Sequence, residues 1–94
     1  MIKSFRNEAA RAAWERRFVK GVPHDVLRIG NRKLLQLHNA RSLQDLRAPP
    51  GNRLEALSGD RRGQHSIRIN DQWRVCFIWD GDGACDVAIV DYHA

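Results

Sequence analysis

Apolar and polar residues alternate along the last third of the chain, from Gln64 to His93. Asn70-Asp71 and the Asp-Gly-Asp-Gly segment at 80–83 interrupt this alternation and have the composition of turns. A two-residue period places successive side chains on opposite faces of a sheet. The pattern therefore predicts a three-stranded antiparallel meander with one apolar face, which carries Ile67, Ile69, Trp73, Val75, Phe77 and Trp79.

The other face of the predicted meander is cationic. Arg68, Arg74 and Cys76 are out of phase with the apolar residues, so we expect them to point away from the core. The segment Asp91-Tyr92-His93 reaches the edge of this face at the end of the last strand. Because strands hold side chains rigidly, we expect a functional site here.

The first half of the chain has the pattern of two helices. Asn7 is suited to cap the first helix, and Gly21 is suited to end it. Trp14 and Phe18 stack at helical spacing, and we expect both in the core. Pro23 fits the first turn of a second helix, whose apolar residues fall within one stripe at the helical period.

A Pro-Pro-Gly segment at 49–51 marks the change from helices to strands. Residues 52–57 are predicted to form a first, weaker strand, with Arg53 and Glu55 on the same side. The order of elements predicts an α+β fold in one domain, residues 1–94, with two N-terminal helices packed on a four-stranded antiparallel sheet.

The chain is basic, with 16 Lys and Arg residues against 11 Asp and Glu residues, a formal net charge of +5. Solubility alone explains such a charge, but a polyanion or an acidic protein partner would also suit it. The start lacks the apolar core of a signal peptide, and no apolar run is long enough to cross a membrane. We therefore expect a cytoplasmic protein without a membrane partner.

Cys76 and Cys85 lie on neighbouring predicted strands. In a reducing compartment they are expected to be free thiols, although one hairpin could bring them close enough for a disulfide. No CxxC or paired-His spacing accompanies them, so we expect no zinc site and no other cofactor.

A cationic face with a carboxylate, a phenol and an imidazole suits RNA cleavage by attack of the 2′-hydroxyl on the neighbouring phosphorus. This reaction needs a base, an acid and cations at the phosphate, and it needs no metal. Glu55 or His93 is the candidate base, and His93 or Tyr92 the candidate acid. Arg74 would stabilise the phosphate charge, and Asp91 would orient His93 or Arg74.

Further side chains are candidates for holding RNA. Arg53 and Arg68 can assist Arg74, while Arg61 and Arg62 border the predicted site. His65 is a weaker candidate near the start of the second strand. A purely structural cationic face, paired with neighbouring acidic residues, would show the same pattern.

Several fragments of the chain occur together in an order and spacing that resemble the HigB-type toxins of the RelE/ParE superfamily. They are Met1-Ile2-Lys3-Ser4-Phe5, Arg53-Leu54-x-x-Leu57-x-Gly59-Asp60-Arg61-x-Gly63, Ser66-Ile67-x-Ile69, Trp73-Arg74-x-x-Phe77 and Asp91-Tyr92-His93. Residues 49–55 and 63–66 are similar to the GraT branch of this group.

The resemblance implies a microbial-ribonuclease-like α+β fold and a bacterial type II toxin. Such toxins cleave mRNA in the ribosomal A site without a metal and so stop translation and growth. The implied partners are mRNA, the ribosome with its rRNA, and a HigA-type antitoxin with a helix-turn-helix domain. Operator DNA would be contacted only through the toxin–antitoxin complex.

The active-site positions of the family fall on Arg74, Asp91, Tyr92 and His93, and all four match. The chain departs from several relatives at Glu55, where they have histidine, and from some at Ser58, where they have a basic residue. Since neighbouring Arg residues favour an ionised carboxylate, the base stays open between Glu55 and His93.

Two other function classes remain open from the sequence. One is a ParE-like toxin that inhibits gyrase by binding. The other is a non-catalytic RNA-binding module whose Arg residues only hold phosphates.

Overall fold

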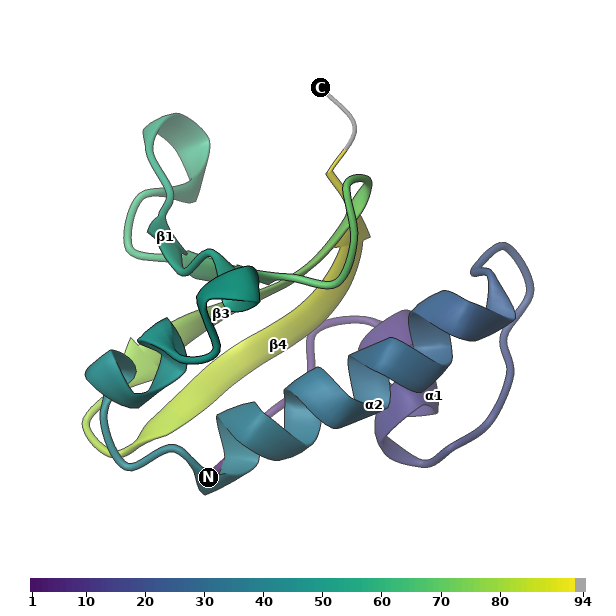
Figure 1. Cartoon of the computed structure of the whole chain (residues 1–94), viewed down its shortest axis with the longest axis horizontal. Coiled ribbons are helices and arrows are strands. Elements are labelled where there is room, and N and C mark those ends of the chain that lie inside the picture. The colour runs from purple at the N-terminus through teal and green to yellow at the C-terminus, as the bar shows by residue number, and fades with distance from the viewer. Residues whose placement is uncertain (93–94) are drawn as a thin grey trace.

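In the computed structural model, which describes residues 1–92, two helices pack on one face of a four-stranded antiparallel sheet (Figure 1). The helices are α1 (Glu8–Trp14) and α2 (His24–Asn39), and the strands are β1 (Glu55–Ala56), β2 (His65–Arg68), β3 (Trp73–Asp80) and β4 (Gly83–Asp91). Three short 3₁₀ helices are η1 (Leu43–Arg47), η2 (Pro50–Asn52) and η3 (Gly59–Arg61). The strands follow the order β1-β2-β3-β4. The predicted α+β fold is confirmed.

The core lies between the helices and the apolar face of the sheet. Ile67, Val75 and Ile89 are aligned across β2, β3 and β4, and all three side chains are buried. A Cβ atom on Gly30 of α2 would lie 2.9 Å from Ile89 Cδ1. The absence of a side chain at this position therefore lets α2 approach the sheet closely.

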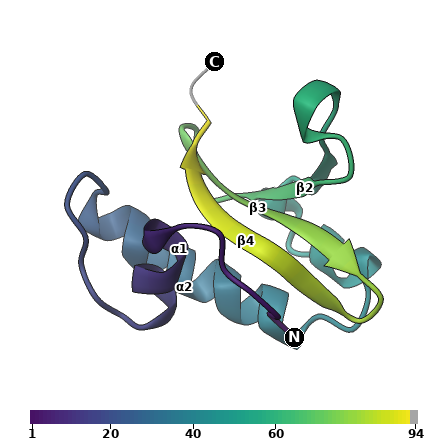
Figure 2. The ribbon, with the colours of Figure 1, turned by 180° about the vertical axis from the view of Figure 1, so that it is seen from behind.

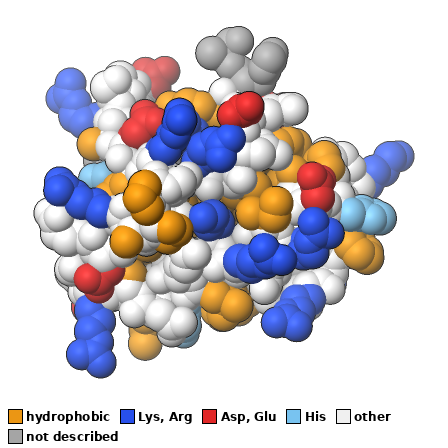
Figure 3. All heavy atoms as spheres, in the orientation of Figure 1, with side chains coloured by type: hydrophobic (Ala, Val, Ile, Leu, Met, Phe, Trp, Pro, Cys, Tyr) orange, Lys and Arg blue, Asp and Glu red, His pale blue; other side chains and the backbone are white. Residues whose placement is uncertain are grey.

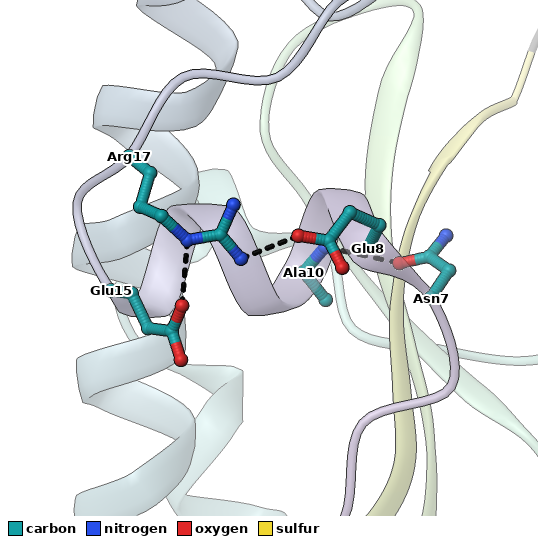
Figure 4. Close-up of polar contacts among 5 residues, drawn as sticks. All are labelled: Asn7, Glu8, Ala10, Glu15 and Arg17. Carbon is teal, nitrogen blue, oxygen red and sulfur yellow. Dashed lines mark hydrogen bonds and ion pairs between the residues drawn. The ribbon is translucent and has the colours of Figure 1, made fainter.

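The N-terminus of α1 is fixed by the predicted cap. Asn7 Oδ1 accepts a hydrogen bond from the Ala10 N–H at 3.0 Å (Figure 4). The Asn7 side chain also donates to the Ile89 carbonyl at 2.9 Å. One residue thus caps α1 and attaches it to β4.

The C-terminus of α1 lies earlier than predicted, at Trp14 and not near Gly21. Arg16 has a φ of 58° and ends the helix in the left-handed conformation. The Arg16 N–H donates to the Ala13 carbonyl at 3.3 Å, and the Arg17 N–H to the Ala12 carbonyl at 2.9 Å. These two bonds form a Schellman motif, with arginine where glycine is usual.

The early helix end changes the environment of Phe18. The Arg17 side chain contacts both Glu15 and Glu8 and closes the turn after α1 (Figure 4). Phe18 then lies outside the helix with 67% of its surface exposed, so its predicted core position is wrong. Trp14 does pack against the core, as expected.

The N-terminal segment runs parallel to β4 and covers its outer edge (Figure 2). Ile2 pairs with Ala84, and Phe5 pairs with Val87. Backbone hydrogen bonds of 2.7–3.0 Å join the two segments. This edge of the sheet is therefore not left with unpaired backbone groups.

The first strand is shorter than the predicted 52–57 segment. Asn52 belongs to η2, and Arg53 adopts a left-handed conformation with a φ of 44°. The Asn52 side chain is fully buried, accepts from Lys33 Nζ at 2.6 Å and donates to Gln36 Oε1 at 3.1 Å. This buried network bends the chain before β1 begins.

Candidate active site on the open sheet face

The register of the sheet brings Glu55 and Arg74 to the face that the helices leave open. Arg74 lies opposite Arg68, and Glu55 lies opposite Ser66, which in turn lies opposite Cys76. Aligned residues of neighbouring strands share a face. Along β3, Arg74 and Cys76 alternate with the buried Val75 and Phe77, so the two pairs point to opposite faces. The predicted division into apolar and cationic faces is confirmed.

Arg74 and Glu55 form an ion pair across β2. Arg74 Nη1 lies 3.0 Å from Glu55 Oε1. The Arg74 side chain is only 13% exposed, whereas that of Glu55 is 47% exposed. Within residues 1–92, Nη1 is buried and makes no aligned hydrogen bond, so the contact is one of charge and proximity.

Tyr92 lies beneath the guanidinium groups of two arginines. The Arg74 Cζ atom is 4.9 Å from the centre of the Tyr92 ring, and the Arg61 Cζ atom is 5.9 Å from it. The Tyr92 N–H donates to the Gln72 carbonyl at 2.5 Å, which fixes the backbone beside the start of β3. The phenol is thus held in a cationic environment on the open face.

Cys76 forms the floor of the same region. Its sulfur lies 4.0 Å from Arg61 Nη1, and the side chain is buried. Burial raises the pKa of the Cys76 thiol, while the positive charges of Arg61, Arg6 and Arg74 act in the opposite direction. Both Cys76 and Cys85 are free thiols, as expected.

Arg6 was not among the residues predicted for this face. Its charge acts on the Cys76 thiol because the N-terminal segment pairs with β4, where the Arg6 N–H donates to the Val87 carbonyl at 2.8 Å. Nothing in the local sequence pattern indicates a pairing between the two ends of the chain. The electrostatic effect of Arg6 on Cys76 therefore follows from the folded structure and not from the sequence pattern.

Arg53 precedes β1, and Arg68 is the last residue of β2. Arg68 Nη2 lies 2.6 Å from Asp71 Oδ1, and this hydrogen bond lowers the pKa of Asp71, with the charge of Arg53 acting in the same direction. Arg62 follows η3 and is exposed. Of these three arginines, Arg68 is the one aligned directly with Arg74 across β2 and β3.

His65 lies on the opposite face of the sheet. It is aligned with Phe77, and the two rings stack with centres 6.2 Å apart. Leu54, Ala56 and His65 line a small cavity of about 190 Å³ below η1. The structure therefore does not bring His65 to the Arg74 group.

At the end of β4, Asp91 is not aligned with Arg74. Asp91 is aligned with Trp73, one residue out of phase with the Arg74–Val90 pair. Its carboxylate accepts a hydrogen bond from Gln72 Nε2 at 3.0 Å. His93 lies outside the described residues, so its predicted role stays a prediction.

A second cavity lies far from this face, in a groove between α2 and the segment after α1. It measures about 620 Å³ and is lined by apolar side chains, including Phe18 and Leu35, with Arg16, Arg28 and Arg32 among them. Figure 3 shows Lys and Arg side chains gathered over α2 beside hydrophobic ones. None of the predicted site residues within 1–92 lines this groove.

Two features are absent from residues 1–92, the part of the chain that the structure describes. No helix in this part of the chain is long and apolar enough to cross a membrane. No group of three or more His, Cys, Asp or Glu side chains there is placed to hold a metal ion.

Comparison with known proteins gave consistent matches. Residues 3–93 match the family model described as the RelE-like toxin of the type II toxin–antitoxin system HigB. Toxin HigB-1 of Vibrio cholerae serotype O1 is 42% identical over 72 residues, which cover 77% of this chain and 75% of the relative. Endoribonuclease HigB of Proteus vulgaris is 34% identical over 94 residues, which cover 99% of this chain and all of the relative, 100%.

Proposed function

The chain belongs to the HigB-like family of RelE-like toxins of type II toxin–antitoxin systems, and on this premise we propose that it is an endoribonuclease that cleaves mRNA in the ribosomal A site without a metal. The relative from Proteus vulgaris, which aligns over the full length, is named as an endoribonuclease. The observation that carries the proposal is the position of the Arg74 guanidinium 4.9 Å above the Tyr92 ring on the open sheet face.

The proposed reaction is an attack of the 2′-hydroxyl on the adjacent phosphorus. A bond forms between the 2′-oxygen and phosphorus, and the bond from phosphorus to the 5′-oxygen breaks. A base takes the proton of the 2′-hydroxyl, and an acid protonates the leaving 5′-oxygen. The products are a 2′,3′-cyclic phosphate and a 5′-hydroxyl end.

Arg74 is the proposed stabiliser of the phosphate charge. Its planar guanidinium matches the geometry of two phosphate oxygens, and its position on a central strand fixes it before substrate binds. Tyr92 or His93 is the proposed acid, and Glu55 or His93 the proposed base. Tyr92 is supported as an acid because it lies next to the proposed phosphate position.

The proposed RNA-binding surface extends from this site along the open face. Arg61 and Arg62 belong to it through the η3 segment, and Arg53 and Arg68 through the edge beyond β1. We leave His65 out of this surface, because it lies on the helix-covered side of the sheet. Binding through these arginines would be strongly salt-dependent.

Membership of the family implies an antitoxin partner. We propose a HigA-type antitoxin with a helix-turn-helix domain, through which the complex would contact operator DNA. The proposed place of action is the bacterial cytoplasm, where ribosomes and mRNA are found.

Controlled induction in cells, followed by mapping of new 5′ ends on mRNA, tests the proposal. We expect new ends within translated regions for the wild type, and none for Arg74→Ala or His93→Ala. Arg28→Ala removes an exposed arginine on α2, far from the sheet face, and is the matched control that should still cleave.

Two outcomes would contradict the proposal. Growth arrest with intact messages and gyrase-linked DNA breaks would support a ParE-like gyrase inhibitor. Salt-dependent RNA binding without any cleavage would support a non-catalytic RNA-binding module.

A further inference from the structure

The two partners of the Arg74–Glu55 ion pair are not equally fixed. Arg74 lies on β3, which has a strand on each side, and its side chain is 13% exposed. Glu55 lies on β1, a two-residue strand at the edge of the sheet, and its side chain is 47% exposed. Glu55 can therefore turn into solvent, whereas Arg74 cannot leave the site easily.

The contact leaves one nitrogen of the guanidinium without an aligned hydrogen bond among the described residues. An arginine binds an oxyanion best through two parallel N–H···O bonds. Here one nitrogen, Nη1, lies 3.0 Å from one carboxylate oxygen, and it forms no aligned hydrogen bond within residues 1–92. Because Glu55 is half exposed and the contact is not bidentate, the ion pair contributes less free energy than a fully aligned pair would. A better-matched anion would displace it.

A phosphodiester of RNA is such an anion. Phosphate and carboxylate oxygens bind the same donors of a guanidinium, and two anions close together repel each other. When a phosphate reaches Arg74, the Glu55 carboxylate has to move away. Its position on a short edge strand leaves space for this movement.

We propose that Glu55 is an internal counter-ion of Arg74, which occupies the phosphate position in the free protein and is displaced by bound RNA. The proposal rests on the proposed ribonuclease function of this site. Glu55 then limits the affinity for RNA and does not take the proton of the 2′-hydroxyl. Of the two candidate bases, this leaves His93.

The test is single-turnover cleavage of mRNA on programmed ribosomes with increasing concentrations of protein. Glu55→Gln keeps the size of the side chain and removes its charge. We expect the protein concentration for half-maximal rate to fall about two- to fivefold, with no decrease in the maximal rate. This difference should become smaller at high salt, because salt screens exposed charges.

Glu15→Gln is the matched control. It removes the same charge from a half-exposed glutamate that pairs with Arg17 beside α1, away from the sheet face. We expect no change in its half-maximal concentration. If both variants shift this concentration equally, net charge and not the Arg74 contact is responsible, and the proposal is wrong.

A fall of about 100-fold or more in the maximal rate of Glu55→Gln, at an unchanged half-maximal concentration, would make Glu55 the base and overturn the proposal. A parallel binding measurement uses single-stranded RNA with 2′-O-methyl groups, which cannot be cleaved. Absence of cleavage by the wild type would refute the proposed function. The binding measurement would still test the counter-ion role of Glu55 in that case. Tighter RNA binding by Glu55→Gln than by Glu15→Gln would support the role, and equal binding would contradict it.

Discussion

Arg74 and Tyr92 are the pair on which the proposed chemistry depends, and the sequence predicted their common face. The alternation along β3 fixes the side of Arg74, since a shift by one residue would expose Val75 and Phe77, both fully buried. The same alternation separates Asp91 from Arg74, because Asp91 is aligned with Trp73. The sequence predicted the side of Arg74 and brought Asp91 and Tyr92 to the edge of that face, but it did not show that Tyr92 faces Arg74 and Asp91 does not.

Tyr92→Phe isolates the phenol hydroxyl. The phenylalanine ring can still lie under the Arg74 guanidinium, so RNA affinity and the free energy of unfolding should hardly change. If Tyr92 protonates the leaving 5′-oxygen, the maximal single-turnover rate should fall about 100-fold. Equal maximal rates for the variant and the wild type would remove Tyr92 from the role of acid.

At the scale of elements, the sequence predicted best those helices and strands that bury one side in the core. The meander and α2 each bury one side, so their apolar periods were reliable signals. The end of α1 and the start of β1 depend instead on two left-handed residues, Arg16 and Arg53. Because neither is glycine, sequence reasoning placed the helix end at Gly21 and began the strand too early.

Arg16→Gly tests the account of the α1 terminus. A left-handed conformation is strained for arginine and not for glycine, so the free energy of unfolding should rise by roughly 0.5–1 kcal/mol. Arg11→Gly is the control within α1 and should lower this free energy by about 1 kcal/mol. Urea denaturation measures both values. A loss of stability in Arg16→Gly as large as that in Arg11→Gly would refute the account.

At the scale of the whole molecule, the fold leaves one sheet face open for chemistry. Both helices cover the other face, and the N-terminal segment covers the outer edge of β4 (Figures 1 and 2). That segment also brings the charge of Arg6 close enough to act on the Cys76 thiol, which no local pattern predicts. The groove along α2 lies on the helix side, and none of its described lining residues belongs to the sheet-face site.

On this sheet face we propose attack of a 2′-hydroxyl on the adjacent phosphate. The most direct measurement compares cleavage of two mRNAs on programmed ribosomes, one unmodified and one with a single 2′-deoxy nucleotide at the mapped cleavage position. We predict that the unmodified mRNA yields a 2′,3′-cyclic phosphate and a 5′-hydroxyl end, and that the 2′-deoxy mRNA stays intact at that position. Cleavage of the 2′-deoxy mRNA at an undiminished rate would contradict the mechanism.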